Sequence, residues 1–205
     1  MSHLACADTP ADPMNAAQRA DFEDLAAVLP TAPRSLAASC GIFLGPAYHY
    51  DMVRPGAALY GLNPLPNNSN PMSQVIELKA KVLQLREIDA GRSVGYGARY
   101  TAGSPSRVAT LGLGYADGIP RSAGEHACVH VGPVEVPIIG RLSMDLITVD
   151  VSALPPDALR PGDFVDVLGP GNDADALARA GGTIGYEILT RLGQRLHRVY
   201  KAAPF

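Results

Sequence analysis

The sequence contains little of what several classes of protein require. It has no tryptophan, only three cysteines and three lysines among 205 residues, and a net charge of −3 at pH 7. This charge and the lack of any Lys/Arg run argue against a nucleic-acid partner. No apolar run approaches the roughly 18 residues of a membrane span, and no basic-then-apolar leader is visible. Because Cys6, Cys40 and Cys128 form no CxxC pair, we expect a cytoplasmic protein.

What is present favours a packed, turn-rich protein. Hydrophobic residues make up 47% of the chain and charged residues 18%, which is enough to build a core. Gly and Pro are also abundant, at 21 and 18 residues, and both favour turns between short elements.

The first sixty residues mix helical and extended patterns. Apolar residues recur with a helical period from Phe22 to Leu29, and Asn15 is the expected N-cap. A strand is expected over 50–53, followed by the first turn of a helix over 57–60. This alternation is typical of an α/β layer, so the fold class predicted for residues 1–60 is α/β.

A segment rich in Pro, Asn and Ser, residues 61–74, is the best candidate for a domain boundary. Beyond it, apolar residues alternate with polar ones, which is the period of a half-buried strand. Closely spaced strands with no helices between them predict a mainly β, antiparallel, barrel-like domain over 61–205. The expected strands cover 76–82, 108–113, 128–131, 134–139, 146–151 and 164–168, and helices are expected at 173–180 and 184–192.

Three stretches can carry chemistry. In DMVRPGAALYGL (51–62), a strand ending in Arg54 opens a helix whose first backbone N–H groups, at Gly56 and Ala57, could hold a phosphate. Alternatively, these residues form an ordinary strand-to-helix turn with an arginine on the surface. In GYGARYTA (95–102), two glycines flank Tyr96. An accessible tyrosine can act as a general base where positive charge stabilises its phenolate, although Gly-Tyr-Gly turns are usually structural.

The third stretch is a pair of strand ends, LGLGYADGIPRSAG (111–124) and VPIIGRLSMDLITVD (136–150). They carry Tyr115 with Asp117, and Arg141 with Met144 and Asp145. Strand-end loops with such residues suit the rim of a site, and they equally suit a capped turn with a salt bridge.

Six blocks in order, VRPGAALYGL, GYGARYTA, GYADGIPR, IIGRLSMD, PGDFVDVLG and GTIGYEIL, resemble the alanine racemases, which are fold-type III pyridoxal-phosphate enzymes. The resemblance covers essentially the whole chain. It implies that residues 1–60 are the last part of a cofactor-binding (β/α)8 barrel and that 61–205 form the C-terminal β-domain. It also implies a homodimer whose active sites are shared between subunits.

The resemblance assigns roles residue by residue. Tyr96 matches the catalytic tyrosine, which takes the α-proton of L-alanine. Arg54 matches the arginine that faces the pyridine nitrogen and, being always charged, discourages a proton there. Other positions match cofactor contacts (His3, Ser39, Gly56, Ala57 and Tyr186), the substrate carboxylate side (Met144 and Asp145) or the access corridor (Tyr115, Arg141, Asp8 and Ile184).

The sequence departs from the family pattern at several positions. Ser35, Ala38 and Ser143 stand where many members have His, Asn and Cys, which puts the supporting hydrogen bonds in question. The Schiff-base lysine has no counterpart, because Lys79, Lys81 and Lys201 lie outside the matching context. Since Lys79 and Lys81 fall on the solvent face of an expected strand, we expect no racemisation by this chain alone.

Two alternatives stay open: a non-catalytic dimerisation fragment, and a racemase of another small amino acid. A metal site is also conceivable, because His126, Cys128 and His130 alternate along one expected strand. Three ligands on five residues of one strand do not converge easily on one tetrahedral ion. We therefore expect no metal and a solvent-facing strand instead.

Overall fold

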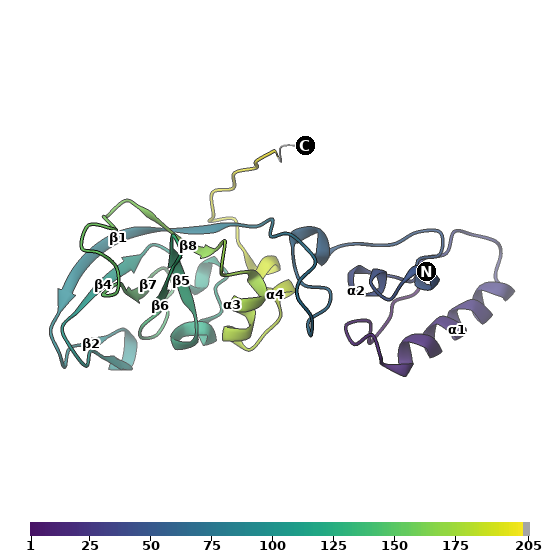
Figure 1. The fold of residues 1–205 in the computed structure, drawn as a ribbon, viewed down its shortest axis with the longest axis horizontal. Coiled ribbons are helices and arrows are strands. Elements are labelled where there is room, and N and C mark those ends of the chain that lie inside the picture. The colour runs from purple at the N-terminus through teal and green to yellow at the C-terminus, as the bar shows by residue number, and fades with distance from the viewer. Residues whose placement is uncertain (203–205) are drawn as a thin grey trace. The chain divides into compact units, whose positions relative to one another are not determined.

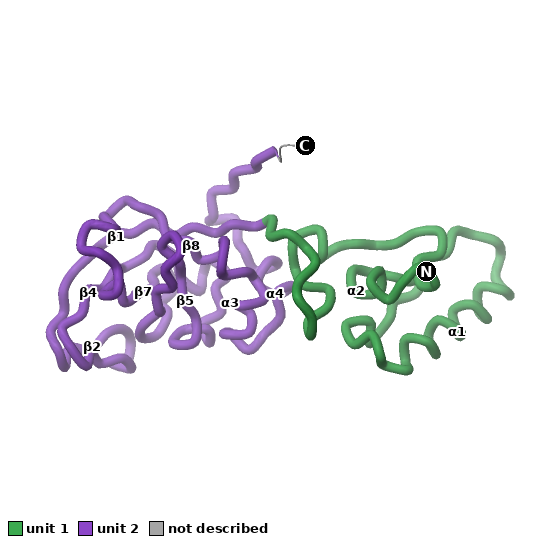
Figure 2. The backbone as a smooth tube through the Cα atoms, viewed as in Figure 1, with its two compact units in different colours: residues 1–75 green, residues 76–205 purple. Residues whose placement is uncertain are grey.

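The computed structural model describes residues 1–202. The chain forms two compact units, residues 1–75 and 76–205 (Figure 2). The border between them follows the segment rich in Pro, Asn and Ser. Within the described residues, no helix is long and apolar enough to cross a bilayer.

The first unit is built from helices and turns (Figure 1). Helix α1 (Pro13–Val28) is capped by Asp12, whose carboxylate accepts a hydrogen bond of 2.8 Å from the backbone N–H of Met14. The short helices α2 (Ser39–Ile42), η1 (Pro46–Tyr48) and η2 (Ala57–Tyr60) follow. One small buried cluster consists of Leu4, Ala7 and Leu36, with partly buried neighbours such as Phe22 and Tyr50, and Ala37, Ala58 and Leu62 are also buried.

Two expectations for this unit are wrong. Asn15 is not the N-cap but lies inside α1, where its buried amide donates to the carbonyls of Cys6 and Thr9, because Pro13 fills the first helical position. Residues 50–53 form no strand, because Tyr50 has a positive φ of 52° that an extended chain does not allow. A single parallel bridge, Ala38 to Arg54, is the extended pairing there. The barrel assignment for 1–60 stays a prediction.

The second unit contains a six-stranded sheet with the order β6-β5-β8-β1-β4-β7. All of its strand pairs are antiparallel, as predicted. An isolated bridge from Ile138 to Val149 brings the two edges together, so the sheet is nearly closed. The strands are β1 (Leu78–Ile88), β4 (Ser106–Leu111), β5 (Cys128–Val131), β6 (Val134–Pro137), β7 (Ile147–Asp150) and β8 (Phe164–Leu168).

Alternation along the strands explains this core. In β1, Leu78, Ala80 and Val82 are buried while Lys79 and Lys81 are exposed, as the sequence period predicts. Leu111 of β4 and Ile147 of β7 are paired and buried. A separate ribbon pairs β2 (Ser93–Val94) with β3 (Tyr100–Thr101), and the short helices are η3 (Tyr96–Ala98), η4 (Tyr115–Asp117), η5 (Arg121–His126), α3 (Ala174–Gly181) and α4 (Gly185–Arg191).

Candidate active site

Arg54 is the most firmly held charged residue of the first unit. One terminal nitrogen of its guanidinium donates to Ser35 Oγ at 2.6 Å, and the other donates to the Ser2 carbonyl at 2.7 Å. The second nitrogen also lies 3.4 Å from His3 Nδ1. Ser35 is buried. The serine that departs from the family pattern thus fixes the arginine, and His3 lies beside it.

Ser39 and the loop before η2 form the second feature of this unit. Ser39 Oγ accepts hydrogen bonds from the backbone N–H groups of Gly56, at 3.0 Å, and Ala58, at 3.2 Å. The donors that converge on Ser39 are therefore at Gly56 and Ala58, and Ala57 lies between them. A side chain at Gly56 would meet nothing within 4 Å, so the backbone is open to an approaching group there.

Tyr96 lies at the start of η3, and its side chain is 70% exposed. The glycines on either side, Gly95 and Gly97, have φ of 78° and 72°, a region that favours glycine. A Cβ at Gly95 would lie 3.1 Å from the backbone nitrogen of Arg141, so these two loops pack backbone against backbone. The sequence predicts an accessible tyrosine here, and the structure adds Arg141 as its neighbour.

The turn at Tyr115 is joined to the loop at Ser143–Asp145. Tyr115 N–H donates to the Ser143 carbonyl at 3.1 Å, and Ala116 N–H donates to the Met144 carbonyl at 3.0 Å. A Cβ at Gly114 would lie 2.2 Å from the Met144 oxygen, so only glycine fits. Ser143 Oγ bonds the Leu146 backbone and closes its own turn. Tyr115 and Met144 are both partly exposed beside this junction.

Arg195 is a residue of this region that sequence reasoning missed. It donates to Asp145 at 2.6 Å and lies 3.3 Å from the buried Asp117. Its hydrogen bond to Asp145 and the charges of both carboxylates raise the pKa of the Arg195 guanidinium. No motif marks Arg195 in the sequence, because it follows Asp145 by 50 residues and Asp117 by 78, and the fold brings it to both loops. Asp145 is thus engaged by an arginine of its own chain.

The remaining predicted positions lie on other elements. Tyr186 lies in the first turn of α4 and is half-exposed, and Ile184 is the exposed N-cap residue of the same helix. Asp8 is exposed in the first unit. Of the predicted set, His3 and Arg54 form one cluster, Ser39 and Gly56 a second, and the loops of Tyr96, Arg141, Tyr115 and Met144 a third.

Comparison with known proteins decides the family. Residues 75–200 match the family model described as alanine racemase, C-terminal domain, and residues 1–64 match alanine racemase, N-terminal domain. The chain belongs to the alanine racemase family. It is 55% identical over 200 residues to an alanine racemase, catabolic, of Mesorhizobium japonicum and 54% identical to an alanine racemase of Rhodospirillum rubrum. Each match covers 98% of this chain and 52% or 54% of the relative, so the chain spans about half of their length.

Solved alanine racemase structures share this fold. The enzyme of Bartonella henselae, described with covalently bound pyridoxal phosphate, superposes with a TM-score of 0.91 at 41% identity, over 97% of this chain and 55% of that one. The Streptomyces lavendulae enzyme also gives a TM-score of 0.91, at 34% identity, over 98% of this chain and 56% of that one. The family resemblance read from the six sequence blocks is confirmed.

The three lysines of this alanine racemase family member have other partners. Lys79 lies 2.5 Å from Asp166, and this hydrogen bond raises the pKa of its ammonium. Lys81 lies over the Phe164 ring at 5.4 Å, and Lys201 is 3.4 Å from Glu77. A lysine that forms a Schiff base must first lose its proton, and a raised pKa opposes that loss.

Proposed function

We propose that this chain is part of a pyridoxal-phosphate-dependent alanine racemase that interconverts L-alanine and D-alanine. The observation that carries the proposal is 55% identity over 98% of the chain to a protein named alanine racemase. The arrangement of the candidate residues supports it, because two clusters suit a cofactor and a third presents an accessible tyrosine.

The first unit fits the cofactor's phosphate and ring. Ser39, with the backbone N–H groups of Gly56 and Ala57, would hold the phosphate. The N–H of Gly56 already converges on Ser39 Oγ with that of Ala58, which supports this, because such a group of donors also suits an anion. Arg54 and His3 would lie at the ring, where a permanently charged arginine keeps a proton off the ring nitrogen. When bound, pyridoxal phosphate supplies the electron sink that makes the α-proton of alanine acidic.

Tyr96 is assigned as the base on one face of the substrate. Its phenolate oxygen takes the proton from Cα of L-alanine, and the phenol that results returns a proton to Cα when D-alanine reacts in the other direction. The exposure of the phenol, and the backbone contact of its loop with Arg141, support this role. Met144 and Asp145 would line the carboxylate side of the substrate. Tyr115 and Arg141 would narrow the access path, which favours a small amino acid.

The opposing base would be a lysine outside these 205 residues, because Lys79, Lys81 and Lys201 do not lie in the matching family context. We therefore propose that the chain alone does not racemise alanine. In the whole protein, a homodimer would bring Tyr96 to the site of the partner subunit. Cys6, Cys40 and Cys128 form no disulfide, which suits the cytoplasm.

A fusion protein tests the assignment. The lysine-bearing N-terminal part of the Rhodospirillum rubrum racemase is joined to residues 1–205, and D-alanine formation is measured. We expect activity from the fusion and none from the chain alone. Tyr96→Phe should lower kcat by about 10²–10⁴-fold, the usual contribution of a general base. Loss of α-deuterium from labelled D-alanine should persist, because the lysine acts on that face.

Tyr100→Phe is the matched control, since Tyr100 lies four residues away and is not assigned to catalysis. It should leave kcat nearly unchanged. Turnover that survives Tyr96→Phe would remove the tyrosine from the mechanism. A fusion that folds and dimerises without racemising alanine would favour the non-catalytic module, and activity on a larger amino acid would change the substrate.

A further inference from the structure

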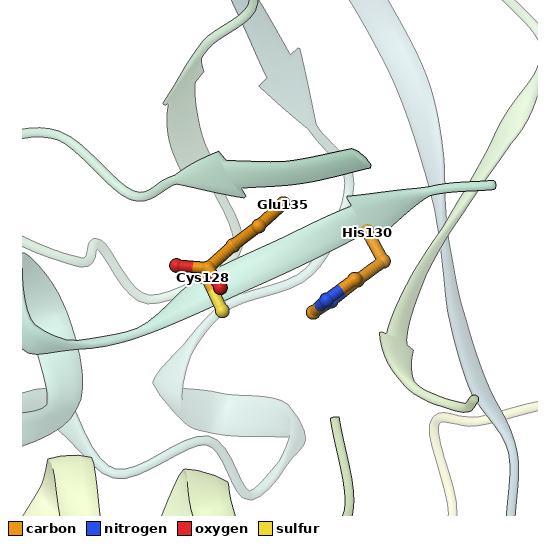
Figure 3. Close-up of side chains that lie close together, drawn as sticks. All are labelled: Cys128, His130 and Glu135. Carbon is orange, nitrogen blue, oxygen red and sulfur yellow. The ribbon is translucent and has the colours of Figure 1, made fainter. Parts of the chain in front are cut away.

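The hairpin of β5 and β6 brings three metal-binding side chains together (Figure 3). Cys128 and His130 are two residues apart on β5, so they share one face of the sheet. Glu135 of β6 is paired directly with His130 and therefore lies on the same face. One ligand atom from each residue lies within 4.8 Å of the others.

This set differs from the one that the sequence suggested. His126 is not on the strand at all, since it is the last residue of η5 and is exposed. The expected solvent-facing strand is also wrong, because His130 is only 8% exposed. Glu135 replaces His126 from the neighbouring strand. Ligands from two strands can converge where three on one strand cannot, which removes the geometric objection to a metal.

The buried histidine points to a ligand. His130 Nδ1 has no hydrogen-bond partner among the described residues. A buried polar atom without a partner costs about 1–3 kcal/mol, so native proteins seldom leave one without a water or an ion. The ring is confined, because a Cβ at Gly171 would lie 3.2 Å from its Nε2. Gly171 therefore leaves the imidazole just enough room on that side.

Cys128 already interacts with the third member of the cluster. Burial, followed by the charge of Glu135 and a hydrogen bond to it, raises the pKa of the Cys128 thiol. A cation that binds Cys128 and Glu135 together would balance the charge of a thiolate and a carboxylate.

We propose that Cys128, His130 and Glu135 bind a divalent cation of the zinc class, with water completing the coordination. Thiolate, imidazole and carboxylate are the ligands that zinc accepts, at bond lengths of about 2.0–2.3 Å. A thiolate and an imidazole disfavour Mg²⁺ and Ca²⁺, which select oxygen ligands. The exposed Glu135 side chain can move to close the remaining distance. This site shares no residue with the proposed racemase site, and the metal proposal does not depend on the proposed function.

Binding of zinc and cobalt to the full 205-residue chain tests the site. After treatment with a chelator, equilibrium dialysis should find one Zn²⁺ per chain. Co²⁺ should produce a near-ultraviolet thiolate-to-metal absorption band. Loss of a supporting residue around a metal costs about 10–100-fold in affinity, so loss of a ligand in Cys128→Ser or His130→Gln should cost at least about 100-fold. Glu135→Gln should weaken binding less, because a water can replace an exposed carboxylate.

His126→Gln and Cys6→Ser are the matched controls, and both should bind zinc as the unchanged protein does. A readout without any variant guards against misfolding: Zn²⁺ should slow alkylation of Cys128 while leaving Cys6 and Cys40 unaffected. Absence of stoichiometric zinc, or equal binding by His126→Gln and His130→Gln, would overturn the site. Equal alkylation of Cys128 with and without Zn²⁺ would do the same.

Discussion

The two units of the chain bury their apolar residues in different ways. In the second unit the sheet curls until its edges meet, and its strands bury their apolar faces against one another. In the first unit, Leu4, Ala7 and Leu36 form a small buried cluster, while Leu25, Val28 and Leu29 at the end of α1 are exposed. A sheet that closes covers its own core, whereas a layer of helices depends on a surface to pack against.

The largest expected effect comes from removing core leucines in each unit. Leu111→Ala should lower the free energy of unfolding of the second unit by about 2–5 kcal/mol, the usual cost of a buried cavity. Leu36→Ala should abolish protection from hydrogen exchange in the first unit, because the cluster that contains Leu36 has three buried members. Hydrogen exchange read by mass spectrometry reports the two units separately.

Leu83→Ala is the control, since Leu83 is half-exposed on β1 and should cost less than about 0.5 kcal/mol. If Leu36→Ala also removes protection from β4 and β8, the units unfold together and the comparison fails.

A smaller effect is expected at the two capped helices. Asp12 caps α1 and Asp173 caps α3, each accepting a backbone N–H bond. Changing either to Ala should cost about 1 kcal/mol, and Asn should restore most of it. Asp12→Ala should raise exchange only in α1, while Asp173→Ala should lower the denaturation midpoint of the whole second unit. If both substitutions lowered the stability of the whole chain by the same amount, the two units would not have separate stabilities.

The smallest effect concerns pH. Burial, with a hydrogen bond from its hydroxyl to Glu23, raises the pKa of Tyr50 from 10.0 to about 12. The folded first unit therefore favours the protonated phenol, and that stability is fully present below pH 10 and is lost as pH rises toward 12. Urea unfolding at several alkaline pH values, followed by circular dichroism, should show this loss. In Tyr50→Phe, the free energy of unfolding should depend less on pH in this range. If the pH dependence were unchanged in that variant, Tyr50 would be excluded as its source.

The sequence predicted the second unit better than the first. The expected strands at 128–131 and 164–168 match β5 and β8, and the period-two alternation expected from residue 76 is seen as alternating burial over Leu78–Val82 of β1. The strand expected at 50–53 failed, because a short apolar run does not reveal the positive φ of Tyr50. The pattern of apolar and polar residues along the sequence predicts a helix or strand well where the packing of distant residues favours the same element.

The candidate sites divide in the same way. Tyr96 and Arg54 were proposed because motifs surround them. Arg195 and Glu135 were missed, since each reaches its partners through pairing between distant loops or strands. Strand register depends on the tertiary structure, and the residues around Glu135 in the sequence do not show that Glu135 is paired with His130.

The junction between the Tyr115 turn and the Met144 loop bears on how this protein can evolve. Two backbone hydrogen bonds and the contact at Gly114 make these segments one rigid body. Substitutions at Tyr115 and Met144 should therefore be epistatic, with a double variant departing from the sum of the single ones. Selection that reshapes the surface of one of these loops would have to change both loops in concert.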